Sequence, residues 1–281
     1  MQIKLNMLVK TCMAALLCLI FIEAKSSNTQ AHFRDSIQFY LNEINSKETS
    51  DRQKYQVNLK LKKHIENNLP NYSFDDNTLD SIKYIGVLNS PDEKLRIITW
   101  NLVWQNGKNS YYGYVQTFKK GKPLKYFALN DKKDPSKDPF RQTLTKDNWF
   151  GALYYDIIPV ECNKQTCYTI LGYDPNDLYS NRKVVELLSF SKTGYPVFGM
   201  PVFQRGKALA HRVVFEYSEY AVMMLRYDDE SERIVFDHLS PVSNQYAGNP
   251  KYYGPDFSYD GMKFKKGKWE YVFDIDLRND K

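Results

Sequence analysis

A period-two alternation of apolar and polar residues is the feature that most constrains the fold of this chain. The alternation begins near Leu79 and continues almost to the last residue. It is clearest near the C-terminal end, where one face of a single segment carries Trp269, Tyr271, Phe273, Ile275 and Leu277. Such a pattern is typical of antiparallel strands that bury one face and expose the other.

Turn residues divide this region into about a dozen short strands, a spacing typical of all-β folds. At residues 105–108 the sequence Gln-Asn-Gly-Lys separates two alternating runs, 95–104 and 111–118, and this Asn-Gly pair predicts a hairpin of two strands. The fold class is therefore mainly β, as an antiparallel sandwich, an open barrel or a partial propeller, and the stretches 130–146 and 240–261 are expected to be loops. Further strands are expected at residues 124–129, 152–160, 168–173, 184–190, 196–203, 212–217, 221–227, 233–239 and 262–264.

A short α-helical N-terminal segment is expected ahead of the strands. Apolar residues recur with the helical period over residues 31–46 and predict an amphipathic helix there: Phe33, Ile37, Tyr40, Leu41 and Ile44. Alternation over residues 55–61 leaves a strand start open as the alternative to a second helix. That second helix, which would end at Pro70, is predicted by apolar residues four apart: Val57, Leu61, Ile65 and Leu69.

The first residues have the pattern of a secretory signal peptide. Lys4 and Lys10 make the start positive, residues 11–22 are mainly apolar, and the run ends near Ala24. A membrane-spanning helix needs roughly 20 apolar residues, so the shorter run favours cleavage near Ala24 over an uncleaved anchor. No membrane span is then expected in the mature chain.

Cleavage would leave two regions. Residues 1–24 are predicted to be the signal peptide, residues 25–78 the helical segment and residues 79–281 the β-rich domain. A lipoprotein signal at Cys18 is disfavoured, because Leu17 stands where a small residue is expected. The predicted location is outside the cytoplasm, in the periplasm, at the outer membrane or secreted.

Charge and cysteine content narrow the classes of partner. Cleavage removes two lysines and one glutamate, so the formal charge falls from +6 to +5, and the remaining basic residues are scattered. Nucleic-acid binding needs a clustered basic face, so no nucleic-acid partner is expected. Cys162 and Cys167 remain after cleavage. In an oxidising compartment this isolated pair predicts a local disulfide rather than a zinc site.

Sequence motifs of the common enzyme classes are absent. The chain has no nucleophile elbow, phosphate-binding loop, dinucleotide fingerprint, His-Glu-x-x-His motif or EF-hand loop, so no cofactor is expected and no metal ligand is assigned. Acids, aromatics and one histidine near turns remain as candidate binding residues: Trp149, Tyr155, Glu216, Asp237, His238, Asp256 and Asp260.

Asp256 and Asp260 are the most suggestive pair, because they stand four apart in a segment rich in glycine and proline. Their carboxylates could converge on a cation or a sugar, but the favoured interpretation is that they only shape turns, since aspartate often does so through its own backbone hydrogen bonds. Asp237 and His238 are neighbours in one expected strand, so their side chains point apart and a structural histidine is favoured. Glu216 would have a raised pKa if it faced inward.

Aromatic residues of one segment offer a second kind of candidate. Trp149 and Tyr155 lie in the sequence Trp-Phe-Gly-Ala-Leu-Tyr-Tyr at residues 149–155. Such rings can stack on a sugar, and the alternative is that they belong to the core.

Five short blocks occur in series within residues 80–280: WFGALYY at 149–155, LGYD at 171–174, VFEYS at 214–218, FDHLSP at 236–241 and GPDFSYD at 254–260. In this order they resemble a family of uncharacterised secreted proteins from Bacteroidetes-type bacteria. The resemblance implies export, and it implies no activity, cofactor or catalytic residue. The helical segment lies outside it.

These observations favour an exported, non-catalytic binding or envelope-assembly protein, with an envelope protein or a glycan as its partner. A secreted hydrolase, acting on glycans, is the alternative. It would draw its acids from Glu216, Asp237, Asp256 and Asp260, and it requires these carboxylates to meet in one cleft.

Overall fold

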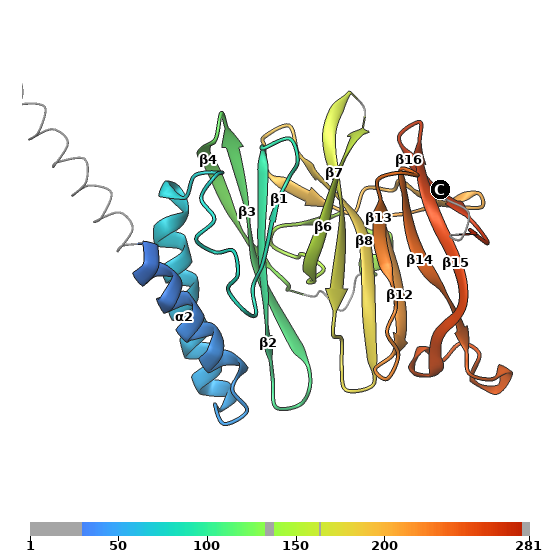
Figure 1. The fold of residues 1–281 in the computed structure, drawn as a ribbon, viewed down its shortest axis with the longest axis horizontal. Coiled ribbons are helices and arrows are strands. Elements are labelled where there is room, and N and C mark those ends of the chain that lie inside the picture. Colours follow the sequence, from blue (N-terminus) through green and yellow to red (C-terminus); the bar gives the residue numbers. More distant parts are fainter. Residues whose placement is uncertain (1–29, 133–137, 163, 277–281) are drawn as a thin grey trace, which may run out of the picture.

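The chain folds into a stack of two helices and three β-sheets (Figure 1). This computed structural model describes residues 30–132, 138–162 and 164–276, so the predicted signal peptide lies outside the described residues. Strands make up 47% of the structure and helices 19%, which confirms the mainly β class with an N-terminal helical segment. Of the three predicted arrangements the sandwich is the nearest to the structure, but it has three layers of sheet instead of two.

Two helices form the first layer. The described part of the first helix spans residues 30–45, and α2 (Asp51–Asn68) leads into the 3-10 turn η1 (Leu69–Asn71). α2 begins before the first of the apolar residues that predicted it, because Ser50 and Gln53 form a capping box at its start. The alternative of a strand over residues 55–61 is therefore wrong.

The first sheet lies against these helices and has four antiparallel strands in sequence order: β1 (Gly86–Asn89), β2 (Leu95–Val103), β3 (Asn109–Lys119) and β4 (Lys122–Asn130). The predicted Asn-Gly hairpin joins β2 to β3. Gly107 occupies its turn with a φ of 77°, a conformation that glycine adopts without steric cost.

The central sheet has the strand order β5-β9-β8-β7-β6, and β12 pairs with the first half of β8. The strands are β5 (Leu144–Thr145), β6 (Leu153–Cys162), β7 (Gln165–Asp174), β8 (Ser180–Phe190), β9 (Pro196–Phe198) and β12 (Arg212–Ser218). The turn η2 (Pro139–Arg141) precedes β5. Both faces of this sheet are covered, so β7 and β8 are buried almost continuously rather than at alternate positions.

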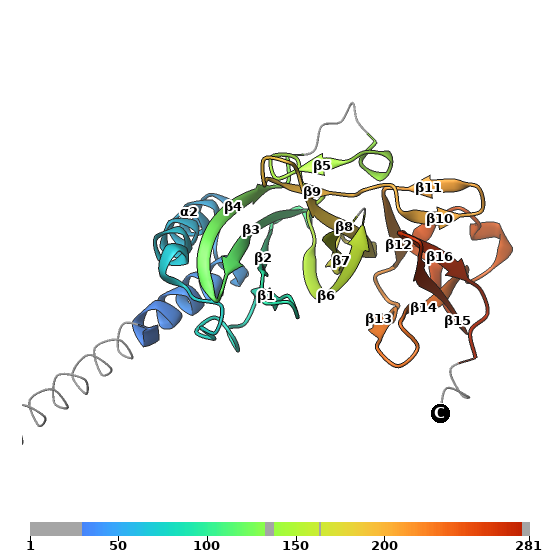
Figure 2. The same ribbon diagram turned by 90° about the horizontal axis from the view of Figure 1, so that it is seen from above.

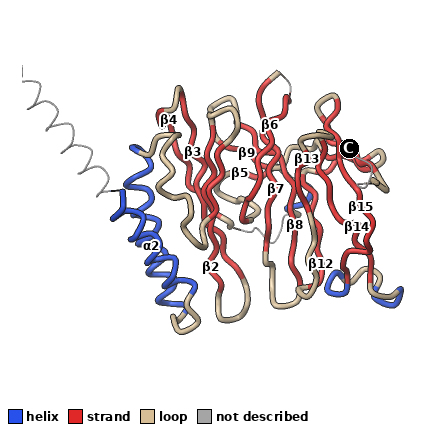
Figure 3. The backbone as a smooth tube through the Cα atoms, viewed as in Figure 1, coloured by secondary structure: helices blue, strands red, loops and turns tan. Residues whose placement is uncertain are grey.

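The last sheet has the strand order β11-β10-β16-β15-β14-β13 and one parallel pair, β10 with β16. The elements are β10 (Phe203–Arg205), β11 (Ala208–Ala210), β13 (Leu225–Asp228), β14 (Arg233–Pro241), η3 (Asn244–Tyr246), η4 (Pro250–Tyr252), β15 (Tyr253–Lys265) and β16 (Lys268–Val272). Figure 3 shows the short turns η3 and η4 at the end of the sheet, between β14 and β15.

Three predicted segments differ from the observed strands. The single strand expected over 196–203 is divided between β9 and β10, since Gly199, with a φ of 76°, and Pro201 interrupt it. Much of the expected loop 240–261 belongs to β15. The last strand ends at Val272, because the chain turns at Asp274, which has a φ of 53°.

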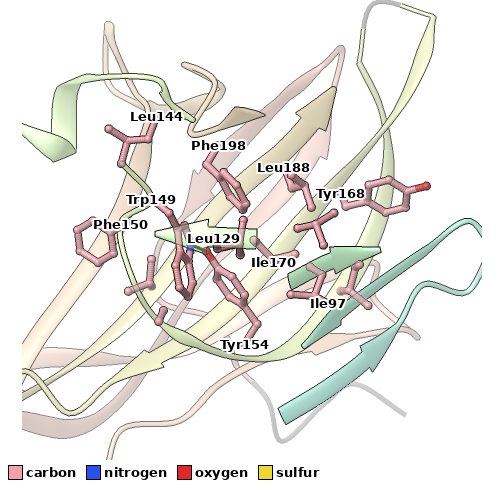
Figure 4. Close-up of a cluster of buried hydrophobic side chains, with 14 of the residues drawn as sticks. Ile97, Leu129, Leu144, Trp149, Phe150, Tyr154, Tyr168, Ile170, Leu188 and Phe198 are labelled. Carbon is pink, nitrogen blue, oxygen red and sulfur yellow. Dashed lines mark hydrogen bonds between the residues drawn. The ribbon is translucent and has the colours of Figure 1, made fainter. Parts of the chain in front are cut away.

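Three apolar cores separate the four layers, whose order is visible in Figure 2. The helices pack on one face of the first sheet around Trp100, and the opposite face packs on the central sheet around Trp149. The third core, which includes Trp269, joins the central and last sheets. Each sheet therefore helps to bury its neighbour, and the side chains of the second core are drawn in Figure 4.

Candidate functional site

Three of the candidate residues converge on the hairpin of β14 and β15. His238 Nδ1 lies 2.9 Å from Asp260 Oδ2, and His238 Nε2 lies 3.9 Å from Asp256 Oδ2. The register of the two strands shifts between Asp237 and Leu239, directly at His238. This irregularity brings both carboxylates to one imidazole, a meeting that the sequence did not predict.

Backbone groups hold both carboxylates in place. Asp260 Oδ1 accepts a hydrogen bond from the Asp274 N–H at 3.0 Å, and its side chain is largely buried. Asp256 Oδ1 accepts from the Ser258 hydroxyl at 2.7 Å and from the Ser258 N–H at 3.2 Å. Burial opposes ionisation of Asp256, but the Ser258 hydrogen bonds and the nearby His238 outweigh it and lower the pKa of this carboxyl.

His238, Asp256 and Asp260, which we call the His238 cluster, help to fasten the C-terminal segment to the last sheet. The Ile275 N–H donates to Tyr259 O at 2.7 Å, next to the bond between Asp274 and Asp260. Ile275 also packs on Gly261, where a Cβ would come within 2.5 Å of its side chain. The nearest group to His238 Nε2 among these contacts is a carboxylate, whereas a nucleophilic triad places a hydroxyl or thiol there. In the described part of the chain, no group of His, Cys, Asp and Glu has the arrangement of a metal site.

Glu216 belongs to a different cluster, on the face of the central sheet that looks toward the first sheet. Its Oε2 lies 2.8 Å from Arg182 Nη2, and Oε1 accepts from the Ser180 hydroxyl at 2.7 Å. Arg182 Nη1 also lies 3.6 Å from Asp174, whose carboxylate accepts a hydrogen bond from Tyr111 of the first sheet. This ion-pair network joins two sheets.

Asp237 stands apart from both clusters, because its carboxylate accepts from the Met224 N–H at 2.6 Å. The four acids named for the hydrolase are therefore divided between the central sheet and the hairpin of β14 and β15. The structure therefore does not bring the four carboxylates together, as the hydrolase alternative requires.

Both aromatic candidates are occupied by protein contacts. Trp149 is fully buried in the second core, and its Nε1 donates to the Tyr154 hydroxyl at 2.7 Å (Figure 4). The idea that Trp149 stacks on a sugar is thus wrong, and its core alternative holds. The Tyr155 hydroxyl donates to Leu225 O at 2.9 Å, and the Lys183 ammonium lies 4.5 Å from the centre of the Tyr155 ring.

The predicted disulfide is not formed in the structure. Cys162 and Cys167 are free thiols, both buried near the end of the hairpin of β6 and β7. A hydrogen bond to Cys167, together with burial, raises the pKa of the Cys162 thiol. Because the two thiols are in contact, the disulfide stays a prediction for the exported protein.

Sequence reasoning missed a surface built by three connections at one end of the central and last sheets, along the lower edge of Figure 1. These connections join β7 to β8, β12 to β13, and β14 to β15. Together they carry four tyrosines, which we call the tyrosine surface: Tyr179, Tyr220, Tyr246 and Tyr252. Tyr220 is the most exposed of them, at 91%.

Contacts between the connections fix the tyrosine surface. The Glu219 N–H donates to Tyr179 O at 3.1 Å, and the Lys251 ammonium lies 4.0 Å from the centre of the Tyr179 ring. The rings of Tyr246 and Tyr252 stack at 4.1 Å with 21° between their planes. The signal available in the sequence was the tyrosine, asparagine and serine content of residues 242–253, a composition typical of binding loops.

Comparison with known proteins found no matching family model, no matching curated protein and no matching solved structure. None of the helices in the described part of the chain combines the length and the apolar character that membrane crossing requires.

Proposed function

We propose that the protein is exported and acts as a non-catalytic binding protein of the cell envelope, with the tyrosine surface as its binding site. The observation that carries this proposal is the gathering of four tyrosines from three separate connections at one end of the stack. Tyrosine combines a large apolar ring with a polar hydroxyl, so it dominates many recognition surfaces. The signal-like first 24 residues support export.

Ordered contacts distinguish this surface from a set of unrelated exposed rings. The Tyr220 N–H donates to the Ser218 hydroxyl at 3.3 Å, which ties the start of this connection to the end of β12. Residues at the two ends of the β14–β15 connection are also bonded, because the Val242 N–H donates to Tyr252 O at 2.9 Å. A surface ordered before binding loses less entropy when its partner arrives.

Co-sedimentation tests the proposal. The mature chain, residues 25–281, is expected to sediment with an envelope fraction of the cells that export it, and the double variant Tyr220→Ser/Tyr252→Ser is expected to stay in solution. Tyr195→Ser is the matched control, since Tyr195 is 52% exposed in the turn after β8, at the opposite end of that strand. Equal sedimentation of all three proteins, or of none, would refute the proposed site. Mass spectrometry of the sedimented native protein should give an N-terminus near residue 25.

A further inference from the structure

We propose that the tyrosine surface recognises a neutral polysaccharide chain, an inference that rests on the proposed function and names its ligand class. The rings come from three connections, so a chain long enough to touch several of them gains more than a single sugar. The inference depends on the charge, the order and the polar neighbours of these rings.

Charge is the first argument. Residues 241–255 contain no aspartate or glutamate, and Lys251 is their single charged residue. The Lys251 ammonium lies over the Tyr179 ring, at 4.0 Å from its centre, where the electron-rich face of the ring stabilises it. The two neighbouring connections carry one acid each, Glu219 and Asp177, and the Asp177 carboxylate accepts hydrogen bonds from the Tyr179 and Ser180 N–H groups at 2.8 and 3.0 Å. The longest connection thus offers a polar but nearly uncharged surface, which suits an uncharged ligand.

Ring order is the second argument. Tyr246 and Tyr252 are stacked within one connection, and the Tyr252 N–H donates to Asn249 O at 3.1 Å. The Gly248 N–H donates to the Tyr253 hydroxyl at 2.9 Å, which closes the loop on itself. The aromatic faces are therefore fixed before a ligand arrives. The C–H face of a sugar ring can pack on such an electron-rich face, and the hydroxyls around the sugar remain available for hydrogen bonds.

The polar neighbours give the third argument. Asn244, Gln245 and Asn249 are exposed between the tyrosines. Each amide group both donates and accepts hydrogen bonds, as each sugar hydroxyl does. The rings of Tyr246 and Tyr252 therefore stand beside groups that can bond the hydroxyls of a sugar. This mixture of rings and amides suits a glycan.

Two exposed valines separate these ligand classes experimentally. Val222 is 87% exposed and Val242 is 74% exposed, and both belong to the connections that carry the tyrosine surface. A protein partner would bury such apolar side chains, whereas a sugar chain that stacks on tyrosine does not need them. Tyr252→Ala and the double variant Val222→Ser/Val242→Ser therefore give opposite results for the two classes.

Affinity electrophoresis of residues 25–281 tests the inference. The gels contain dextran, galactomannan, xyloglucan, arabinoxylan or the neutral polysaccharide fraction of the same envelope, with polygalacturonate as the anionic comparison. At least one neutral polysaccharide is expected to retard the wild type. Tyr252→Ala is expected to lower the association constant about tenfold, a loss typical of a contact aromatic. Val222→Ser/Val242→Ser should bind like the wild type.

The outcomes separate this inference from the proposed function. Retardation by polygalacturonate alone, or by none of the gels, overturns the inference, as does neutral binding that Tyr252→Ala leaves unchanged. If tyrosine-dependent sedimentation with the envelope persists in either case, the proposed function stands and the valine variant identifies a protein partner by its loss of binding. If the protein neither binds a neutral polysaccharide nor sediments with the envelope in a tyrosine-dependent way, both proposals are refuted.

Discussion

At the scale of single residues, Asp256 combines two tasks. Its carboxylate orders the backbone through Ser258 and also lies 3.9 Å from the imidazole of His238. Between Asp256 and Ser258 the chain adopts a conformation that bulky residues avoid, because Phe257 has a φ of 69° while its side chain is 93% exposed. The Asp256 hydrogen bonds therefore stabilise a turn that the sequence would not otherwise favour.

Asp256→Asn should make the stability of the protein less dependent on acid pH. The pKa of Asp256 is lowered in the folded state, so its contribution is complete above the unfolded value of about 3.9 and is lost as the pH falls through the folded pKa. At pH 6 we expect the variant to be less stable by about 0.5–1 kcal/mol, the usual size of such a hydrogen bond. The difference should shrink between about pH 5 and pH 3.

Urea unfolding at several pH values measures this effect. Asp229→Asn, in the turn between β13 and β14, is the control for general loss of negative charge. If the free energies of unfolding of Asp256→Asn and the wild type differ by the same amount from pH 6 to pH 3, the role given to the carboxylate is contradicted.

At the scale of elements, alternation located the long strands of the first sheet, although the helices and the central sheet cover its two faces. β2, β3 and β4 fall where the pattern placed them, and β14 does too. The pattern missed the short strands β1, β5 and β11, because two to four residues cannot define a period. It also missed the extent of β15, since a bulge at residues 256–258 changes which side chains share a face.

The candidate site was only partly predictable for the same reason. The sequence favoured turn roles for Asp256 and Asp260 over a shared ligand, and their meeting point at His238 depends on pairing across the hairpin. The sequence left sugar stacking and the core as alternatives for Trp149, because burial cannot be read from a ring beside a turn. The tyrosine surface was missed because its members are far apart in sequence and meet only through the strand order of the central and last sheets.

Substituting glycines at the two ends of β9 should have very different costs. Gly199 has a φ of 76° and Gly194 a φ of 81°, so Ala introduces similar backbone strain of about 1 kcal/mol at each. At Gly199, however, the new Cβ would lie 2.3 Å from Arg212 Nη2, whereas at Gly194 no atom lies within 4 Å. The Arg212 guanidinium is fully buried against Glu186, at 3.1 Å, and cannot move away without breaking this pair.

Gly199→Ala is therefore expected to cost at least about 3 kcal/mol more than Gly194→Ala, because disrupting one side of a buried ion pair leaves an uncompensated charge. Guanidinium unfolding of the two variants gives the comparison. Equal losses of stability would mean that Arg212 moves freely and that the buried pair does not fix this part of the central sheet.

At the scale of the whole molecule, the three cores make each layer depend on the next. The helical segment shares a core with the first sheet, in which Leu61 and Ile65 of α2 pack with Ile98, Trp100 and Tyr114. Polar contacts cross the same boundary, since Trp100 Nε1 donates to Asn58 at 2.8 Å and the Lys54 ammonium donates to Val103 O at 3.0 Å. The helices therefore act as the outer layer of the β stack.

Truncation measures this dependence. A chain of residues 79–281 would expose Ile98, Trp100 and Tyr114, all of them fully buried in the complete protein. Each large apolar side chain contributes about 1.5–3 kcal/mol by burial, so their joint loss approaches the total stability of a typical domain. We expect this truncated chain to bind a hydrophobic dye and to lack the near-ultraviolet circular dichroism of fixed aromatic side chains. A chain beginning at residue 30 is the control and should keep both native properties. Cooperative unfolding of residues 79–281 with a native aromatic spectrum would instead show that the sheets fold without their helical layer, and the helices would then be free to serve a separate role.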